Sequence, residues 1–222
     1  MQGIIFDFNG TLLFDSQLHY DAWKLFSKKL RGYEFSDTEM REKMFGRRNA
    51  DIIEYALGYT PSEEEITRLA YEKEEMYRQM CLKNRKEFVL APYAEDFLDY
   101  LKEKNIPRTI ATMSEWDNVE FYIKEFKLER WFDLDKIVYS DGKIAGKPAP
   151  DIYLIAAKNI GIAPENCVVI EDSLAGLESA NNANIGHIIA IATLENDSFY
   201  SQIPYVKGII HNYKDVFNYI KF

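Results

Sequence analysis

The sequence predicts an α/β protein in which a parallel β-sheet lies between layers of helices and a block of helices is inserted after the first strand. From about residue 88 onward, short apolar runs alternate with segments of helical periodicity, which is typical of a parallel sheet covered on both faces. From residue 16 to residue 84 the periodicity is helical throughout. We therefore expect a core domain formed by residues 1–15 and 86–222 and a helical domain formed by residues 16–85.

The first strand pattern ends in a carboxylate. Residues 4–6 form a continuous apolar run, as expected for a strand buried on both faces, and Asp7 follows at its carboxyl end. Asn9 and Gly10 then break the strand. Ligands of open α/β sheets bind beyond the carboxyl ends of the strands, which makes Asp7 a candidate nucleophile or metal ligand. The alternative is that Asp7 only starts a turn or caps a helix.

The helical block shows clear start signals. Ser36 should be the N-cap of the second helix, because Glu39 lies three residues later and completes a capping box. Asn49 is a candidate cap of the third helix, and Thr-Pro-Ser-Glu-Glu-Glu at residues 60–65 is a start signal for the fourth. After the first helix, which begins near residue 16, the expected spans are 37–45, 50–57 and from 60–65 to about 83.

The second part of the chain supplies the rest of the expected sheet. Asn184 is expected in a left-handed conformation after the last long helix. The expected helices span 93–104, 118–126, 150–159 and 174–183, and the expected strands span 107–112, 137–139, 168–172, 188–191 and 208–210.

Composition narrows the class of protein. The 222-residue chain has a formal net charge of -9, which argues against a nucleic-acid or anionic-membrane partner and favours a bound cation. Its two cysteines, Cys81 and Cys167, form neither a disulfide framework nor a metal-binding spacing. Neither a signal peptide nor an apolar run long enough to span a bilayer is apparent. We expect a cytoplasmic monomer.

Polar residues follow four of the apolar runs or the loops near them. The carboxyl ends of parallel strands meet at one edge of a sheet, so these residues should gather there. Taken singly, each has an ordinary explanation, as a helix cap or a solvated lysine. The four groups are Asp7 with Asn9, Thr112 with Ser114, Lys147, and Glu171 with Asp172.

The chemistry of these groups converges on a phosphoryl group. Asp7 is suited to attack phosphorus and form an aspartyl phosphate. The Thr112 hydroxyl and the Met113 N–H can donate to phosphate oxygens, and Lys147 can neutralise charge on the transferring group. Asp7 and Asp172 can share a Mg²⁺ ion, without which two carboxylates would repel an anionic substrate.

These stretches resemble the motifs of the haloacid dehalogenase (HAD) superfamily, in its β-phosphoglucomutase-like phosphatase branch with a helical cap. Residues 6–12 (Phe-Asp-Phe-Asn-Gly-Thr-Leu) resemble the first motif, Thr112 the second, residues 146–151 the third and residues 169–176 the fourth. The resemblance implies a Rossmann-like three-layer α/β core with a parallel sheet, plus an inserted α-helical cap domain. It implies catalytic roles for Asp7, Asn9, Thr112 and Lys147, and a Mg²⁺ site formed by Asp7, the Asn9 carbonyl, Asp172 and, in support, Glu171.

The insert resembles the cap of that branch. Residues 19–24 resemble its first cap helix, and residues 45–49 lie where the branch carries a substrate-specificity loop. Arg47 or Arg48 could bind a second anionic group of the substrate. The alternative is a solvated basic turn. The residues expected to contact or border the substrate are Gly10, Met113, Ser114, Gly46, Arg47, Arg48 and His19, the last as a half-buried hinge residue.

Asn9 departs from the family pattern, which normally has Asp at this position to move protons to the leaving group and from water. A carboxamide hydrogen-bonds but does not transfer protons at neutral pH. Three interpretations remain: a working hydrolase with another proton relay, which we favour, a weak or specialised phosphotransferase, and a catalytically impaired protein that binds a phosphorylated metabolite.

The predicted function is therefore Mg²⁺-dependent hydrolysis of a small phosphate monoester through an aspartyl phosphate on Asp7. A phosphosugar mutase of the β-phosphoglucomutase type is the alternative within the same class.

Overall fold

The computed structural model of the protein describes residues 2–44, 47–86 and 88–220. The chain divides into two compact units, one formed by Met1–Phe14 with Val89–Phe222 and the other by Asp15–Phe88. We call them the α/β unit and the helical unit. In the described part of the chain, every helix is too short or too polar to cross a membrane.

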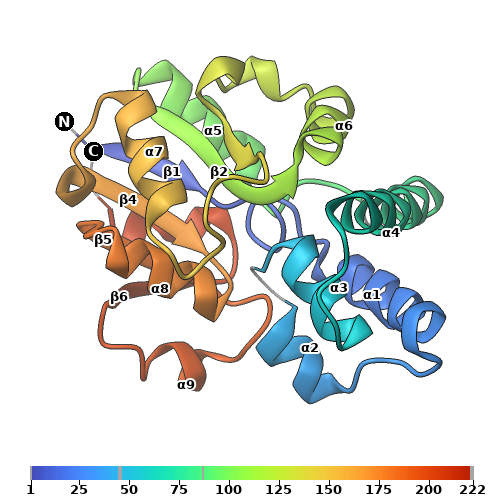
Figure 1. Ribbon diagram of the computed structural model, residues 1–222. Helices are drawn as coiled ribbons and strands as arrows, with labels where there is room; N and C mark the ends of the chain where they lie inside the picture. Colours follow the sequence, from blue (N-terminus) through green and yellow to red (C-terminus); the bar gives the residue numbers. More distant parts are fainter. Residues whose placement is uncertain (1, 45–46, 87, 221–222) are drawn as a thin grey trace. The chain divides into compact units, whose positions relative to one another are not determined.

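A six-stranded sheet forms the centre of the α/β unit and confirms the predicted parallel α/β fold (Figure 1). All its strand pairs are parallel, and the order is β3-β2-β1-β4-β5-β6. The central strand β1 is hydrogen-bonded to both β2 and β4, with Phe6 in register with Ile110 and Ile170. The strands are β1 (Gly3–Phe6), β2 (Arg108–Glu115), β3 (Val138–Ser140), β4 (Cys167–Glu171), β5 (His187–Ile191) and β6 (Val206–Ile210).

Helices cover both faces of this sheet. Successive residues of a strand point to opposite sides, so the side chains of β1 contact both helix layers. Ile5 joins a buried cluster with side chains of α7 and α8, which lie in front of the sheet in Figure 1. Phe6 points the other way, and its ring packs against Phe97 of α5, Phe132 and Tyr213 at centroid distances of 6.0–6.2 Å. The longer helices of the unit are α5 (Ala94–Glu103), α6 (Trp116–Phe126), α7 (Asp151–Ile160) and α8 (Leu174–Asn182), and a short α9 spans Asp197–Tyr200.

The helical unit has its own core. Apolar side chains of its helices form one buried cluster that includes Trp23, Phe26, Met40, Ile53 and Leu69. The predicted capping box is present at the start of α2, where the Ser36 hydroxyl accepts from the Glu39 N–H and the Glu39 carboxylate accepts from the Ser36 N–H. The helices are α1 (Ser16–Arg31), α2 (Asp37–Lys43), α3 (Asn49–Leu57) and α4 (Glu63–Lys83).

Two local predictions were wrong. Asn49 is the first residue of α3 and Arg48 is the N-cap; the Asn49 amide instead donates to Glu74 Oε1 of α4 at 2.9 Å. Strand β2 continues past Thr112 to Glu115, because Glu115 pairs with Ser140 of β3 beyond a register shift. Asn184 does adopt the predicted left-handed conformation, with φ of 55°.

Candidate active site

The carboxyl edge of the sheet carries the acidic residues that the sequence singles out. Asp7 follows β1 directly, and Glu171 ends β4, the strand that pairs with β1. The Asp7 N–H donates to the Ile170 carbonyl at 3.1 Å, which continues the ladder between the two strands. Parallel pairing of two central strands therefore brings Asp7 beside Glu171 and Asp172, although about 160 residues separate them in sequence.

Lys147, from the loop between β3 and α7, lies between two of these carboxylates. Its Nζ donates to Asp7 Oδ1 and to Glu171 Oε2, each at 2.6 Å, and its side chain is 1% exposed. Burial alone lowers the pKa of Lys147, but the charges of Asp7 and Glu171 and the hydrogen bonds to them outweigh burial and raise that pKa. Lys147 is thus a buried, charged ammonium group that fixes the Asp7 carboxylate in place.

Glu171 is held from several sides. Besides the bond from Lys147, its Oε2 accepts from the Tyr153 hydroxyl, and its Oε1 accepts from the Ser173 N–H and hydroxyl. Burial raises the pKa of Glu171, but Lys147 and these hydrogen bonds outweigh burial and lower it. Glu171 therefore serves as an ionised anchor for Lys147.

Gly176 in α8 makes room for this anchor. A Cβ atom at residue 176 would lie 2.0 Å from the Glu171 Cδ atom and 2.1 Å from Oε2. We expect Gly176→Ala to displace the Glu171 carboxyl, to lower stability by roughly 1–3 kcal/mol and to reduce activity, because overpacking forces side chains from their positions. Urea unfolding and an activity assay test this expectation. Gly32→Ala is the control, because residue 32 has φ of 85° and an added Cβ atom would meet no atom within 4 Å. That variant should lose stability but keep activity.

Three carboxylates form a candidate cation site. One oxygen of each of Asp7, Glu171 and Asp172 lies within 4.8 Å of the others, and all three side chains are buried. Thr11 donates to Asp172 Oδ1 at 3.0 Å. The pKa of Asp172 is raised well above its usual range. Burial is the main cause, and the negative charges of Glu171 and Asp7 add to it.

The charges and donor types at this cluster fit a divalent metal ion. If all three carboxylates were ionised, they would carry two negative charges more than the Lys147 ammonium neutralises, and a divalent cation would balance that excess and displace the proton that the raised pKa of Asp172 favours. Carboxylate oxygens are the ligands that Mg²⁺ prefers. Glu171 is already occupied by Lys147, Tyr153 and Ser173, so Asp7 and Asp172 are the better candidates for direct ligands.

A second group of predicted residues meets around the Asn9 side chain. Asn9 Oδ1 accepts from the Ser114 hydroxyl at 2.7 Å and from the Thr112 hydroxyl at 3.5 Å. Asn9 Nδ2 donates to the Tyr122 hydroxyl at 2.8 Å. The sequence did not point to Tyr122, because it belongs to the apolar stripe of α6 and is fully buried, with its ring stacked on Phe8 at 4.5 Å.

Gly10 and Met113 complete the predicted residues of the α/β unit. Gly10 has φ of 79°, a conformation that suits glycine, and this turn lets its N–H donate to the Leu13 carbonyl at 2.7 Å. Its own carbonyl accepts from the Thr193 hydroxyl at 2.9 Å. The Met113 side chain is half-buried and packs against the apolar cluster under α7 and α8.

The other predicted site residues belong to the helical unit. His19 lies in a polar network: its Nδ1 is 3.1 Å from Lys73 Nζ, its Nε2 is 3.3 Å from Asp15 Oδ2, and its ring stacks on Tyr77. The Arg48 guanidinium forms two hydrogen bonds with Asp51, at 2.7 and 3.0 Å. The Arg47 side chain is exposed, and Gly46 lies outside the described residues.

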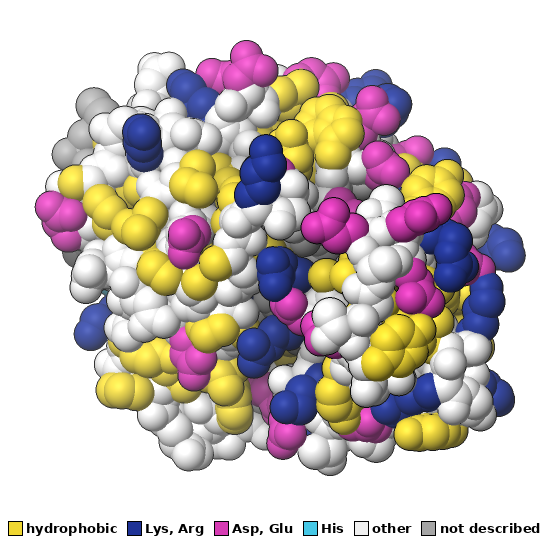
Figure 2. All heavy atoms as spheres, viewed as in Figure 1, with side chains coloured by type: hydrophobic (Ala, Val, Ile, Leu, Met, Phe, Trp, Pro, Cys, Tyr) yellow, Lys and Arg dark blue, Asp and Glu magenta, His cyan; other side chains and the backbone are white. Residues whose placement is uncertain are grey.

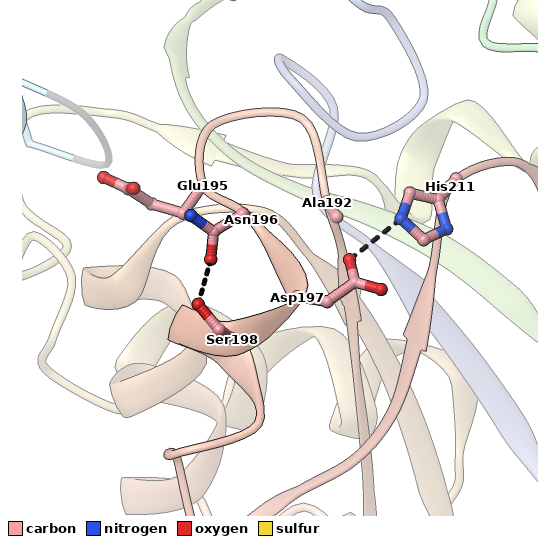
Figure 3. A pocket seen from close by; sticks show the side chains of 6 residues that line it. All are labelled: Ala192, Glu195, Asn196, Asp197, Ser198 and His211. Carbon is pink, nitrogen blue, oxygen red and sulfur yellow. Dashed lines mark hydrogen bonds and ion pairs between the residues drawn. The ribbon is translucent and has the colours of Figure 1, made fainter.

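A separate hollow of about 510 Å³ lies beyond the ends of β5 and β6 (Figure 3). It is lined in part by Asp197 and His211, whose Oδ1 and Nε2 atoms are in an exposed hydrogen-bond contact of 2.9 Å. Asn196 caps α9 by accepting from the Phe199 N–H, and it also accepts from the Ser198 hydroxyl. These polar groups pair with one another, so the hollow adds no group to the cluster around Asp7.

On the face of the molecule drawn in Figure 2, acidic and basic side chains are interspersed.

Comparison with protein families shows which family has this fold and these motifs. A family model described as haloacid dehalogenase-like hydrolase matches residues 1–184, and the chain therefore belongs to the haloacid dehalogenase-like hydrolase family. The resemblance noted in the sequence is thereby confirmed.

Known proteins are similar to this chain over most of its length. The phosphorylated carbohydrates phosphatase of Thermotoga maritima is 27% identical over 200 residues, which cover 89% of this chain and 88% of that protein. The beta-phosphoglucomutase of Bacillus subtilis is 28% identical over 190 residues, covering 83% and 81%. Among solved structures, a HAD hydrolase, family IA, variant 3, from Entamoeba histolytica is 40% identical, with a TM-score of 0.87 and coverage of 100% and 96%.

Proposed function

We propose that this hydrolase is a Mg²⁺-dependent phosphatase that cleaves a small phosphorylated metabolite through an aspartyl phosphate on Asp7. The observation that carries the proposal is the buried cluster of Asp7, Lys147, Glu171 and Asp172, which combines a nucleophile with a fixed cation and an excess of negative charge. The name of the Thermotoga relative supports a phosphorylated carbohydrate as the substrate.

In this mechanism the residues of the chain have distinct tasks. Lys147 holds Asp7 Oδ1 and thereby orients the carboxylate whose oxygen bonds to phosphorus. The Met113 N–H, and the hydroxyls of Thr112 and Ser114 once they turn from Asn9 Oδ1, would bind phosphate oxygens. Bound Mg²⁺ would neutralise charge on the phosphoryl group. It would be held by Asp7, Asp172 and the Asn9 carbonyl, with Glu171 in support.

We assign the helical unit the role of a cap that closes over the substrate and excludes water. Its contribution to specificity would come from Gly46, Arg47, Arg48 and His19. Because Arg48 is paired with Asp51, Arg47 is the better candidate for binding a second anionic group.

The mutase alternative is favoured by a specific finding, the similarity to the beta-phosphoglucomutase of Bacillus subtilis. A mutase returns a phosphoryl group from Asp7 to a sugar hydroxyl, whereas a phosphatase releases inorganic phosphate. The two are distinguished by following both products.

The proposal is tested by incubating the protein with sugar, nucleotide and acyl phosphates, with Mg²⁺ or with EDTA, and measuring released phosphate and rearranged sugar phosphate. We expect Mg²⁺-dependent phosphate release that is absent from an Asp7→Asn blank. Release that persists in the blank, or in EDTA, would contradict the proposal.

Metal binding should release protons. The raised pKa of Asp172 means that the metal-free site holds protons that Mg²⁺ must displace, so the apparent affinity should rise as the pH rises through that pKa and level off above it. Calorimetric titrations in two buffers of different ionisation enthalpy measure the release. Asp172→Asn should abolish both the binding and the buffer dependence, and wild-type binding without buffer dependence would contradict the assignment.

A further inference from the structure

Hydrolysis through Asp7 needs two proton transfers. In the first half, an Asp7 oxygen bonds to phosphorus while the bond to the leaving oxygen breaks, and an alkoxide leaving group must then gain a proton. In the second half, a water oxygen bonds to phosphorus, the water loses a proton, and the bond to the Asp7 oxygen breaks. Positioned acids and bases accelerate such steps by about 10²–10⁴-fold.

The side chain of Asn9 does not meet this need. A carboxamide neither releases nor accepts a proton near neutral pH. The structure holds it in place with the hydroxyls of Ser114 and Tyr122, at 2.7 and 2.8 Å, and with the more distant Thr112 hydroxyl. Hydroxyl groups are themselves weak acids and weak bases, so these contacts orient the amide without adding an acid or a base.

The ionisable groups beside Asp7 have other tasks. Lys147 is bound by two carboxylates at 2.6 Å, and if it lost its proton both would remain buried without a cation. Glu171 accepts hydrogen bonds from Lys147, Tyr153 and Ser173. Asp172 belongs to the proposed metal site. Lys147 and Glu171 are thus committed to structure, Asp172 to metal binding and Asp7 to nucleophilic attack.

We propose, as a refinement that rests on the proposed function, that this enzyme accepts phosphoryl groups mainly from donors with acidic leaving groups, namely acyl and aryl phosphates, and that its Asp7 phosphoenzyme is long-lived. A carboxylate or an acidic phenolate departs without a proton, so the first half proceeds. The second half still requires water to lose a proton, and it therefore limits turnover. This substrate class differs from the alkyl phosphates of sugars that the name of the Thermotoga relative suggests, and it replaces the expectation of a separate proton relay.

The test uses the full-length protein with Mg²⁺ and acetyl phosphate, the matched variant Asn9→Asp, and rapid quenching followed by intact-mass measurement. We expect the wild type to accumulate one phosphoryl group per chain, located at Asp7 by peptide mapping. Asn9→Asp should dephosphorylate about 10²–10⁴-fold faster and accumulate little. Across aryl and alkyl phosphates, phosphorylation of the wild type should depend more steeply on leaving-group acidity than that of Asn9→Asp.

One further variant and one check on residue 9 sharpen the result. Tyr122→Phe keeps the ring stacked on Phe8 and removes the hydroxyl that contacts Asn9, so it tests whether Tyr122 moves protons. A marked lengthening would mean that Tyr122 relays protons and would overturn the inference. Peptide mapping also checks that residue 9 is still Asn, because deamidation at Asn9-Gly10 would create the missing acid.

Two failures can be told apart. If wild type and Asn9→Asp both form and hydrolyse the phosphoenzyme at rates within about tenfold of each other, another relay is present and only this inference fails. If neither protein is phosphorylated at Asp7 by any donor, the proposed function itself fails.

Discussion

Replacing Asp7 with Asn is expected to abolish phosphoryl transfer while leaving the protein folded. The change removes the attacking oxygen anion but keeps a side chain of nearly the same size that can still accept from Lys147. Loss of a nucleophile typically lowers turnover by about 10⁴–10⁶-fold, so the residual rate should approach the blank. The measurement is phosphate release with saturating Mg²⁺, together with a search for the phosphoenzyme by intact mass.

The stability of Asp7→Asn carries a second, independent signature. Removing one carboxylate lowers the excess negative charge of the cluster, while Lys147 keeps Glu171 as its partner. We therefore expect the unfolding midpoint of the variant in EDTA to be no lower than that of the wild type. The additional stabilisation by Mg²⁺ should be smaller, since one ligand is lost.

Asp7→Glu is the matched control because it keeps the charge and moves the carboxylate by one methylene. If Asp7 acts as a nucleophile, this variant should also lose transfer, since displacement by about 1 Å is costly in a positioned reaction. It should nevertheless retain much of the Mg²⁺-dependent stabilisation. Full activity in either variant would show that another group attacks phosphorus.

The positions of Asp7, Glu171 and Asp172 were predictable because their neighbourhood follows from the sheet. Residues 4–6 and 167–170 are continuously apolar, which is the mark of central strands in a parallel sheet, and a polar residue after each must lie at the carboxyl edge. The family motifs added the assignment of roles. The roles themselves are proposals that the experiments above address.

Features that depend on tertiary contacts were not predictable. Tyr122 is indistinguishable from a core residue in the stripe of α6, and only the fold brings its hydroxyl to Asn9. Asn49 has a good capping side chain, yet it donates to Glu74 on another helix. The bridging position of Lys147 between two carboxylates is likewise a property of the folded loop, because the local sequence Gly-Lys-Pro is also compatible with a solvated lysine.

Lys147→Met is expected to have the largest effect on stability. The methionine fills a similar volume, but Asp7 and Glu171 lose the buried cation that each contacts at 2.6 Å. Removing one partner of a buried ion pair costs about 3–5 kcal/mol, because the remaining charges are left uncompensated. Urea unfolding in EDTA measures the loss, and phosphoryl transfer should be lost with it, because Asp7 is no longer held in place.

The pH dependence identifies the cause of this loss. In the wild type the pKa of Glu171 is lowered, so its contribution to stability is present above its unfolded pKa and is lost as the pH falls. Without Lys147, burial and repulsion from the neighbouring carboxylates should raise the pKa of Glu171. The native variant would then hold more protons than the unfolded chain, and its stability should fall as the pH rises from about 5 to 8.

Asp172, whose pKa is already raised in the wild type, adds a slope of the same sign to both proteins. The informative quantity is therefore the slope of stability against pH in Lys147→Met minus the same slope in the wild type. We expect this difference to be negative. Mg²⁺ should recover part of the lost stability, since it supplies positive charge to the same carboxylates.

Lys143→Met is the matched control, because Lys143 is an exposed lysine in the same loop. Surface substitutions of this kind usually change stability by less than about 0.5 kcal/mol and should leave the pH slope unchanged. If Lys147→Met behaved like Lys143→Met in both stability and slope, Lys147 would not neutralise the buried carboxylates, and the charge argument for a divalent ion at this site would have to be abandoned. A loss of stability with an unchanged slope would instead indicate a packing defect, and a loss with the predicted slope would establish Lys147 as the cation that allows Asp7 to remain ionised inside the protein.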